Sequence, residues 1–424
     1  MIDHSSVLHI KPFSEPVKAT IRIPGSKSYT NRALVIAALT KGQVILDRPL
    51  YSEDTEAMLD CLHQLGLRID TSADQIVVYN DISVVSNKCY ELFANASGTT
   101  IRFLLALLAL TPGTQVLRGT KRLNERPIKD LVDALCSIGA KIDYLETTGQ
   151  PPLKILSSTL RGDSEVFVNA TMSSQFVSAL LMIAPILNSL TINVCGDLMS
   201  KPYVDMTIHM MKEWGIHVEC AYDHTYYIPP GQHYQKQRYT IQGDYSSAGY
   251  FFAAAALTHS TLTLENLHPQ SVQADRQLLT ILAAMGSRFT YQDDAVTIIG
   301  KGIQPITINM QECPDQVQTM AVLAAFAEGK STISGVRSLR LKETERILAL
   351  KTELAKMGIK TEDDHDTLTI YGGCPKAAEI DTYGDHRMAM AFAVAGTKLP
   401  GMRIKHPEVV NKTFPTFWEE LKKL

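Results

Sequence analysis

The sequence repeats one two-helix pattern at intervals of about seventy residues, and this repetition limits the folds that the chain can adopt. In each copy, an apolar segment with a polar, often cationic, start precedes an amphipathic segment that ends in an apolar residue, a glycine and an apolar or small residue. Such repetition is typical of architectures in which one supersecondary unit buries its apolar faces against its own copies. The 424 residues accommodate about six units, and a sixth copy of the second segment occupies residues 417–424. The glycines that close the other copies are Gly66, Gly139, Gly215, Gly286 and Gly358.

Strand-like and helix-like segments alternate along each unit. Extended runs such as 189–195 and 260–264 begin the units, and short runs such as 141–144 follow the closing glycines. The first helical segments are apolar on nearly every side, for example at 251–257 and 320–327, so we expect them to be buried. The second segments carry charges along one face and should lie outside. The alternation of strands and helices favours the α/β class.

Six units divided as three plus three would give two similar domains. A chain of this length has room for two domains of ordinary size. The least helical stretch, 228–242, is rich in proline, glycine and glutamine and lies between the third and fourth copies. We therefore expect one domain boundary there.

Bulk composition excludes several classes of function. The chain has 41 basic and 44 acidic residues and a formal net charge of −3, so we expect no binding of nucleic acid through overall charge. The start of the sequence lacks the basic and apolar regions of a signal peptide, and apolar stretches such as 179–187 are too short to span a membrane. The seven cysteines are scattered without metal-ligand spacing, which is typical of reduced thiols. These features favour a cytoplasmic location.

The polar starts of the apolar helical segments carry the chemical signal. Ser, Thr and Asp are common there as N-caps, and capping is a sufficient explanation for each hydroxyl taken alone. A helix start also presents free N–H groups and the positive end of the helix dipole, which together favour anions. An unpaired buried charge costs about 3–5 kcal/mol, so cations at buried helix starts indicate an anionic partner. These cations are Lys27 and Arg32 in 25–32, Arg102 in 97–102 and Arg387 in 383–387, and the start at 171–175 adds Ser173, Ser174 and Gln175.

Other basic residues follow the same logic. Arg126 lies at the start of a second helical segment, where a cation opposes the helix dipole and needs another reason to be present. Lys342 and Arg346, taken alone, are better explained as a solvated face with i,i+4 ion pairs. Lys412 could simply be a loop lysine. Together, these residues indicate substrates with more than one phosphate or carboxylate, groups that arginine binds bidentately.

Several common catalytic motifs are absent from the sequence. Residues 25–28 read Gly-Ser-Lys-Ser, but a phosphate-binding P-loop requires Gly-Lys-Ser/Thr with a further glycine upstream, and this run has neither. This absence argues against a nucleotide-hydrolysing enzyme. The sequence also lacks Gly-x-Ser-x-Gly and the zinc-binding pattern His-Glu-x-x-His.

Ten motifs in register, from Gly25 to Pro415, resemble those of the 5-enolpyruvylshikimate-3-phosphate synthase family. Each motif alone is weak, whereas ten in order across nearly the whole chain are highly specific. They are Gly-Ser-Lys-Ser-x-x-Asn-Arg (25–32), Ser-Gly-Thr-Thr-x-Arg (97–102), Glu-Arg-Pro-Ile (125–128), Ser-Ser-Gln-Phe (173–176), Ser-Lys-Pro-Tyr (200–203), Gly-Asp-x-Ser-Ser-Ala (243–248), Pro-Asp (314–315), Leu-Arg-x-Lys-Glu-Thr-x-Arg (339–346), Asp-His-Arg-Met-Ala-Met-Ala (385–391) and Lys-Thr-Phe-Pro (412–415).

The resemblance implies a reaction and a fold. The reaction is transfer of the enolpyruvyl group of phosphoenolpyruvate to the 5-hydroxyl of shikimate 3-phosphate, with release of phosphate, in the shikimate pathway to chorismate and the aromatic amino acids. The fold is an inside-out α/β barrel of two similar lobes, each with three βαβαββ repeats and buried parallel helices whose N-termini point to an interlobe cleft. Residues 22–241 would form the first lobe, and residues 1–21 with 242–424 the second. We expect a monomer that binds these two small molecules and requires no metal or organic cofactor.

The resemblance also implies roles for individual residues. Asp315 and Glu343 would act as the acid/base pair, together with Lys27 as a third catalytic residue. The 5-hydroxyl must lose a proton while the methylene carbon gains one, so a carboxylate on each side can move both protons and stabilise the oxocarbenium-like centre. Shikimate 3-phosphate would be bound by Lys27, Ser28, Arg32, Ser173, Ser174, Gln175, Ser200, Asp315, Ser338 and Lys342. Phosphoenolpyruvate would be bound by Lys27, Gly98, Arg126, Gln175, Arg346, Arg387 and Lys412.

The chain departs from the family pattern at three positions, and two alternative functions remain open. Ala96, Phe103 and Ser338 stand where many members have Asn, Pro and Asn, respectively. The nearest alternative is the sister enolpyruvyl transferase that acts on UDP-N-acetylglucosamine. That family typically has a reactive cysteine ahead of its first-lobe arginine, and residues 115–127 contain none. A non-catalytic repeat scaffold would explain the periodicity but not the helix starts rich in cations and hydroxyls.

Overall fold

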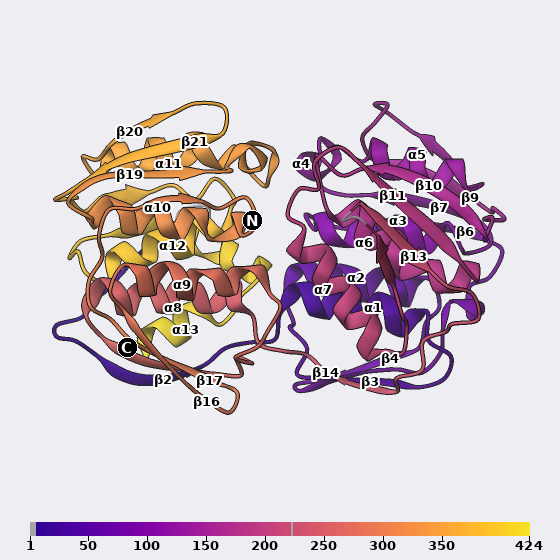
Figure 1. Cartoon of the computed structure of the whole chain (residues 1–424), viewed down its shortest axis with the longest axis horizontal. Coiled ribbons are helices and arrows are strands. Elements are labelled where there is room, and N and C mark those ends of the chain that lie inside the picture. Colours follow the sequence, from indigo (N-terminus) through magenta and orange to yellow (C-terminus); the bar gives the residue numbers. More distant parts are fainter. Residues whose placement is uncertain (1–5, 222–223) are drawn as a thin grey trace. The chain divides into compact units, whose positions relative to one another are not determined.

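The computed structural model describes residues 6–221 and 224–424, and its helices and strands alternate as the sequence predicts (Figure 1). The six apolar segments are all helices, and nearly every one of their residues is buried. They are α1 (Lys27–Ala38), α3 (Gly98–Leu108), α6 (Gln175–Ile183), α8 (Tyr245–Thr258), α10 (Val317–Phe326) and α12 (His386–Gly396). The amphipathic partners are α2 (Glu53–Gln64), α5 (Lys129–Ser137), α7 (Pro202–Glu213), α9 (Gln277–Ala284), α11 (Arg346–Lys356) and α13 (Phe417–Lys422), and a short α4 (Lys121–Asn124) precedes α5.

The repeated glycines end the amphipathic helices through one hydrogen-bond pattern. After α11, Gly358 has a φ of 78°, its N–H donates to the carbonyl of Ala355 at 2.9 Å, and the N–H of Ile359 donates to the carbonyl of Leu354 at 3.0 Å. This pair of bonds satisfies carbonyls that the helix end would leave without partners. It requires one residue in the left-handed backbone conformation, which glycine adopts at little cost. The same two bonds follow α2, α5, α7 and α9 at Gly66, Gly139, Gly215 and Gly286.

Among the described residues, five of the six small sheets have four strands in the same order. In the second repeat, β6 (Cys89–Phe93) pairs in parallel with β7 (Thr114–Arg118), which pairs antiparallel with β9 (Leu153–Leu156), and β8 (Lys141–Tyr144) lies at the edge. The third repeat repeats this order with β10 (Ser164–Asn169), β11 (Leu190–Cys195), β13 (Thr225–Ile228) and β12 (Glu219–Ala221). The fifth repeat uses β18 (Thr307–Asn309), β19 (Gly329–Ser334), β21 (Thr367–Gly372) and β20 (Lys360–Asp363).

The remaining three sheets are completed by strands that are distant in sequence. β14 (Arg238–Thr240) pairs in parallel with β3 (Val44–Asp47) of the first repeat, beside β5 (Gln75–Val78) and β4 (Ile69–Ser72). β2 (Lys18–Arg22) pairs in parallel with β15 (Thr261–Glu265) of the fourth repeat, beside β17 (Ala295–Ile299) and β16 (Arg288–Gln292). In the sixth, β1 (Val7–His9) pairs antiparallel with β23 (Arg403–Lys405), which is parallel to β22 (Glu379–Ile380).

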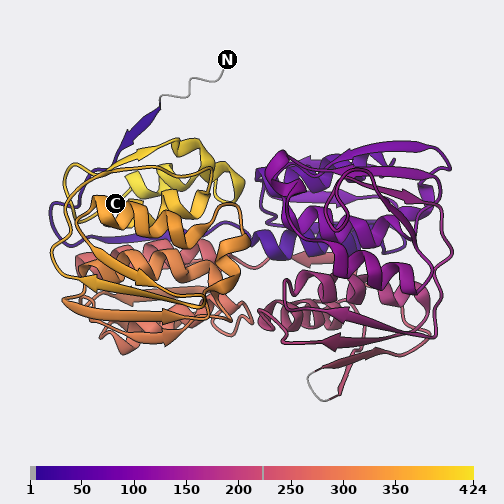
Figure 2. The same ribbon diagram turned by 90° about the horizontal axis from the view of Figure 1, so that it is seen from above.

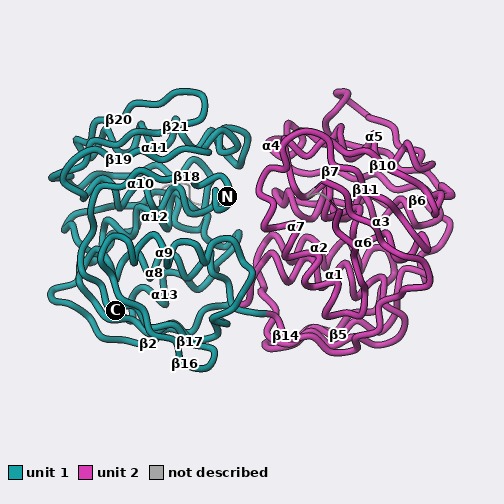
Figure 3. Tube along the Cα trace, in the orientation of Figure 1, with its two compact units in different colours: residues 1–24, 242–424 teal, residues 25–241 magenta. Residues whose placement is uncertain are grey.

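The chain divides into two compact units, each with its own apolar core (Figure 3). Unit 1 comprises residues 1–24 and 242–424, and unit 2 comprises residues 25–241. Within unit 1, helices α8, α10 and α12 contact one another, and the sheets and amphipathic helices surround them (Figures 1 and 2). Within unit 2, α3 contacts both α1 and α6. The predicted α/β class, with buried apolar helices and repeated small sheets, is therefore confirmed.

Short 3₁₀ helices carry several of the residues that the sequence analysis singled out. They are η1 (Ile82–Val84), η2 (Ala184–Leu187), η3 (Ala274–Arg276), η4 (Pro314–Gln316), η5 (Arg337–Leu341) and η6 (Pro407–Lys412). Within residues 6–221 and 224–424, none of the helices combines the length and apolar character needed to cross a bilayer.

Candidate active site

In unit 2, Lys27 is held by a carboxylate from a neighbouring helix. Lys27 is the first residue of α1, and its Nζ lies 3.0 Å from Oδ2 of Asp54 in the first turn of α2. The Asp54 side chain is 4 % exposed and the Lys27 side chain 15 %. The backbone carbonyl of Asp54 also accepts a hydrogen bond from Thr100 Oγ1 of α3, at 3.0 Å. These contacts bring the starts of α1, α2 and α3 together.

Arg32 lies deeper in unit 2 and contacts only polar groups and one aromatic ring in its described contacts. Its guanidinium donates to Thr207 Oγ1 at 2.7 Å and to the carbonyls of Ser28 and Tyr203 at 3.0 and 3.1 Å. It also lies over the ring of Phe103, 5.1 Å from the centroid. Burial lowers the pKa of Arg32 to about 10. In this arrangement, Arg32 links α1 to α7, and any ligand contact would have to share its donors.

Arg102 positions two of the expected binding residues. Its Nη1 donates to Gln175 Oε1 at 2.7 Å, and its Nη2 donates to the carbonyl of Pro127 at 3.3 Å, next to Arg126. Gln175 Nε2 in turn donates to Thr99 Oγ1 at 3.2 Å, so the starts of α3 and α6 are joined. The sequence places Arg102 among the cations at the starts of apolar helices. Its described hydrogen bonds connect α3 to the start of α6 and to the segment before α5.

Gly98 and Arg126 are in close contact. A Cβ atom added to Gly98 would lie 2.6 Å from Arg126 Nη1 and 3.0 Å from its Cζ, so the guanidinium packs directly on the glycine backbone. Since Gly98 is the first residue of α3, Arg126 lies at the start of a buried helix. Of the other expected residues of unit 2, Ser28 and Ser173 are half-buried, Ser174 is buried, and Ser200 is buried with a φ of 56°.

In unit 1, one buried arginine binds three carboxylates. Arg346 Nε lies 2.6 Å from Asp385 Oδ2, its Nη2 lies 2.9 Å from Glu343 Oε2, and its Nη1 lies 3.5 Å from Asp315 Oδ1. Burial alone would lower the pKa of Arg346, but the charges of Asp385, Glu343 and Asp315 outweigh it and raise the pKa above its ordinary value. Arg346 therefore stays protonated, and it holds Asp315 and Glu343 against the same guanidinium.

Arg387 fixes Asp315 from the other side. Arg387 Nη2 lies 2.7 Å from Asp315 Oδ2, and Nη1 donates to the Asp315 backbone carbonyl and to Tyr250 OH, each at 3.3 Å. The N–H of Arg387 donates to Asp385 Oδ1 at 2.9 Å, so Asp385 caps α12 as well as binding Arg346. Two guanidiniums and three carboxylates thus form one charge network at the starts of α10, α11 and α12.

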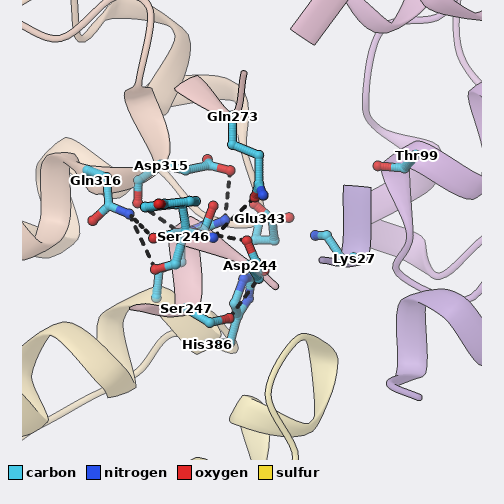
Figure 4. Close-up of polar contacts among 12 residues, drawn as sticks. Lys27, Thr99, Asp244, Ser246, Ser247, Gln273, Asp315, Gln316, Glu343 and His386 are labelled. Atoms are coloured by element: carbon cyan, nitrogen blue, oxygen red, sulfur yellow. Dashed lines mark hydrogen bonds and ion pairs between the residues drawn. The ribbon is translucent and has the colours of Figure 1, made fainter. Parts of the chain in front are cut away.

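A second polar network connects the starts of α8 and α10 (Figure 4). Gln316 Nε2 donates to the carbonyl of Ser246 at 3.2 Å, and a Cβ atom at Gly249 would lie 2.4 Å from Gln316 Oε1. Asp244 caps α8 by accepting the N–H of Ser246 at 3.0 Å. Figure 4 shows these groups of unit 1 with Asp315, Glu343 and His386, and it also draws Lys27 and Thr99 of unit 2.

The other expected residues of unit 1 lie on neighbouring loops. Ser338 is in η5, and its Oγ is buried without a hydrogen-bond partner among the described residues. Lys342 follows η5 and is half-buried. Lys412 ends η6, is 5 % exposed, and belongs to a segment that contacts α12.

The structure supplies anionic partners that the sequence analysis did not identify. Asp54 pairs with Lys27, and Asp385 pairs with Arg346. Both carboxylates stand at helix starts, where acidic residues are expected for capping alone, so the sequence offered no sign of these pairings. Among the described residues, no group of three or more His, Cys, Asp or Glu side chains is arranged to hold a metal ion.

The geometry of unit 1 suits proton transfer beside an anion. Asp315 and Glu343 keep 22 % and 16 % of their side chains exposed, whereas Arg346 and Asp385 behind them are almost fully buried. A pair of accessible carboxylates held by buried guanidiniums can donate and accept protons at fixed positions. The adjacent cations can bind phosphate or carboxylate groups through charge-assisted hydrogen bonds.

Comparison with known proteins identifies relatives of this chain. The family model for EPSP synthase (3-phosphoshikimate 1-carboxyvinyltransferase) matches residues 13–421. The protein named 3-phosphoshikimate 1-carboxyvinyltransferase from Nostoc punctiforme is 42 % identical over 415 residues, covering 97 % of each chain. The protein of the same name from Paraburkholderia phytofirmans is 40 % identical over 425 residues, covering 97 % of this chain and 98 % of the relative.

Solved structures agree on the fold. A structure of EPSP synthase from Acinetobacter baumannii superimposes with a TM-score of 0.82 over 98 % of both chains, at 24 % identity. Since the family model covers nearly the whole sequence and the relatives match over almost their full length, this chain belongs to the EPSP synthase (3-phosphoshikimate 1-carboxyvinyltransferase) family.

Proposed function

We propose that the polar groups at the helix starts of the two units bind phosphoenolpyruvate and shikimate 3-phosphate and carry out the transfer between them. As a member of its family, the chain is a 3-phosphoshikimate 1-carboxyvinyltransferase, and it transfers the enolpyruvyl group of phosphoenolpyruvate to the 5-hydroxyl of shikimate 3-phosphate. The family match and the named relatives support this acceptor rather than UDP-N-acetylglucosamine.

The addition step requires two proton movements. The 5-hydroxyl loses a proton as it attacks C2 of the enolpyruvyl group, and the methylene carbon gains one. We assign these proton transfers to Asp315 and Glu343, with Lys27 as the third catalytic residue. The positive charge that develops at C2 is stabilised by the two carboxylates. Phosphate then leaves C2 as the newly formed methyl group loses a proton, which restores the enolpyruvyl double bond, and nearby cations stabilise the charge of the released phosphate.

The single observation that carries this assignment is that Asp315 and Glu343 share the guanidinium of Arg346, at 3.5 and 2.9 Å. One buried cation therefore fixes two partly exposed carboxylates near each other. Arg387 adds a second contact to Asp315 at 2.7 Å, which leaves that carboxylate little rotational freedom. Such preorganisation is what a positioned acid/base pair needs, because it reduces the reorganisation that must accompany the reaction.

We assign substrate binding to the other residues. Shikimate 3-phosphate is bound by Lys27, Ser28, Arg32, Ser173, Ser174, Gln175, Ser200, Asp315, Ser338 and Lys342, and phosphoenolpyruvate by Lys27, Gly98, Arg126, Gln175, Arg346, Arg387 and Lys412. Several of these cations have carboxylate partners within the chain. An incoming phosphate or carboxylate must share or replace those contacts, so substrate binding should rearrange the ion pairs of Lys27 and Arg387.

Arg126→Ala tests the assignment in unit 2. Loss of one charge-assisted contact to phosphoenolpyruvate should lower kcat/KM about a hundredfold, or about 3 kcal/mol, with little change in Tm. Arg122→Ala is the matched control, because Arg122 lies four residues before Arg126, is 46 % exposed and pairs with Glu125 at the surface. Equal kcat/KM for Arg126→Ala and the control would refute the role of Arg126.

Glu343→Gln and Asp315→Asn test the assignment in unit 1. Each substitution keeps the size of the side chain and removes a proton-transfer group, so kcat should fall by about 100- to 10,000-fold while the substrate still binds. Binding of shikimate 3-phosphate is measured by isothermal titration calorimetry. Full turnover by either variant would exclude that residue from acid/base chemistry.

We also propose that the enzyme acts as a monomer in the cytoplasm. Scattered cysteines support a reducing compartment. Size-exclusion chromatography with light scattering tests the first point, since a monomer should have a mass of about 46.8 kDa at all concentrations. Fractionation of cells tests the second.

A further inference from the structure

Arg340 is a residue of the 339–346 motif to which the binding and catalytic assignments give no role, and its side chain makes several polar contacts. It lies in η5, between Ser338 and Lys342, and its side chain is 27 % exposed. Nη1 lies 3.1 Å from Glu345 Oε1, and Nη2 lies 2.7 Å from Asp363 Oδ2 in β20. The guanidinium also donates to the backbone carbonyls of Asp364 and His365, at 2.5 and 3.5 Å.

The contact between Arg340 and Glu345 spans the segment that carries Glu343. Residues 342–344 form bends between η5 and α11 and belong to neither helix. Glu345 is the N-cap of α11, where its carboxylate accepts the N–H of Leu348. Because Arg340 binds this capping residue from the far side of the bends, it fixes both ends of the segment on which Glu343 sits.

The hairpin turn between β20 and β21 anchors the same loop. Asp366 Oδ1 accepts the N–H of Arg337 at 3.0 Å, and Asp364 accepts the N–H groups of Asp366 and Thr367 at 2.9 and 2.8 Å, which orders the turn. Asp363, at the base of the turn, pairs with Lys351 of α11 as well as with Arg340. Hydrogen bonds from Lys351 and then from Arg340 lower the pKa of Asp363, so the carboxylate remains ionised at neutral pH.

We propose that Arg340 is a positioning residue for the transferase reaction: by joining Asp363 and Glu345 it holds Ser338, Lys342 and Glu343 in their working places. The inference rests on the proposed function, which assigns substrate binding to Ser338 and Lys342 and proton transfer to Glu343. Arg340 itself is turned toward the hairpin and α11, so it acts through these residues without touching substrate. Guanidinium geometry suits this role, because two carboxylates and two carbonyls are bound in different directions by one planar group.

Arg340→Gln tests the proposal against a matched control. The control is Lys360→Gln, since Lys360 is on the same strand as Asp363 and pairs with Glu362 on the exposed surface, at 2.8 Å. Displacement of the catalytic segment should raise KM for shikimate 3-phosphate and lower kcat, with kcat/KM reduced about tenfold to a hundredfold. KM for phosphoenolpyruvate should change less than KM for shikimate 3-phosphate, because all of the residues assigned to phosphoenolpyruvate except Arg346 lie on other segments. Lys360→Gln should retain the kcat and both KM values of the parent enzyme.

Two further variants separate positioning from a loss of fold. Arg340→Lys keeps the charge and one ion pair, and it should recover part of kcat/KM. Asp363→Asn should reproduce the KM increase, and the double variant with Arg340→Gln should lose no more activity than Arg340→Gln alone, since both act through one contact. Affinity for shikimate 3-phosphate is measured by calorimetry on protein whose urea midpoint is known, so that the fraction folded is fixed.

The outcomes distinguish failure of the Arg340 proposal from failure of the proposed function. Parental KM and kcat in folded Arg340→Gln overturn the positioning role, as does an equal loss in Lys360→Gln. A loss of activity that only follows the unfolded fraction also overturns it, because positioning must alter the folded enzyme. If Glu343→Gln keeps full turnover, the proposed function fails first. If Glu343→Gln is inactive and Arg340→Gln is normal, only the inference about Arg340 fails.

Discussion

The guanidinium of Arg346 and the carboxylate of Asp385 form a bidentate ion pair in the interior of unit 1, with an Nε–Oδ2 distance of 2.6 Å and an Nη2–Oδ1 distance of 3.2 Å. The Arg346 side chain is 1 % exposed and that of Asp385 is not exposed at all. Because Asp385 also caps α12, this pair joins the starts of α11 and α12. The catalytic assignment of Glu343 and Asp315 depends on Arg346 being held in this way.

Asp385→Ala should destabilise the protein strongly. Removing one partner of a buried pair leaves the other charge without compensation, at a cost of about 3–5 kcal/mol. Urea unfolding followed by circular dichroism measures the change. Arg403→Ala is the control, since Arg403 pairs with Glu379 at the surface and surface changes of this kind stay within about 0.5 kcal/mol. A difference of less than about 1 kcal/mol between the two variants would contradict the account, because it is smaller than the cost expected for an unpaired buried charge.

Gly358→Ala should cost about 1 kcal/mol, although nothing lies within 4 Å of the added methyl group. The cost comes from the φ of 78° that the helix end requires. Gly373→Ala is the matched control, because Gly373 also has no atom within 4 Å of an added Cβ and its φ lies outside the left-handed range. We expect Gly373→Ala to be neutral or slightly stabilising. Equal losses for the two variants in thermal unfolding would show that φ is not the cause.

Gly98→Ala should weaken the binding of phosphoenolpyruvate more than that of shikimate 3-phosphate. The added Cβ would lie 2.6 Å from Arg126 Nη1, so the guanidinium must move away from the start of α3. KM for phosphoenolpyruvate should rise about tenfold to a hundredfold. KM for shikimate 3-phosphate serves as the internal control. Equal increases in both constants would indicate a general distortion of unit 2 instead of displacement of Arg126.

The stability that the Arg238–Asp47 ion pair adds to the pairing of β14 with β3 should depend on pH. A hydrogen bond from Arg238, at 2.7 Å, lowers the pKa of Asp47 below its ordinary value of 3.8. A carboxyl whose pKa is lowered in the folded state contributes stability at pH values above the ordinary pKa, and this contribution is lost as the pH falls through the lowered pKa. Arg238→Gln should therefore be less stable than the parent at pH 7, and the gap should close below the ordinary pKa of 3.8. A gap in the urea midpoint that stays constant down to pH 3 would exclude this ion pair as its cause.

The sequence predicted the local elements well because their signals are local. Gly286 and Gly358 end amphipathic helices as their positions indicated, and the apolar helix α10 is buried on all sides as its composition required. The sheet partners β14 and β3 could not be predicted from pattern alone, since no periodicity connects Arg238 with Asp47.

The site was harder to predict than the fold because its ion pairs join distant segments. The cations at the helix starts indicated anionic partners, and their identity as Asp54 and Asp385 of the chain itself emerges only in three dimensions. Arg102 illustrates the same limit. Its charge at a helix start suggested ligand binding, whereas its described bonds hold Gln175 and the carbonyl of Pro127.

The central claim is that this chain joins phosphoenolpyruvate to shikimate 3-phosphate, and one assay tests it most directly. Purified protein is incubated with phosphoenolpyruvate and either shikimate 3-phosphate or UDP-N-acetylglucosamine, and both released phosphate and the enolpyruvyl product are measured. We predict equal amounts of phosphate and product with shikimate 3-phosphate and none above background with the UDP-sugar. Product formed only with the UDP-sugar, or with neither acceptor, would contradict the account.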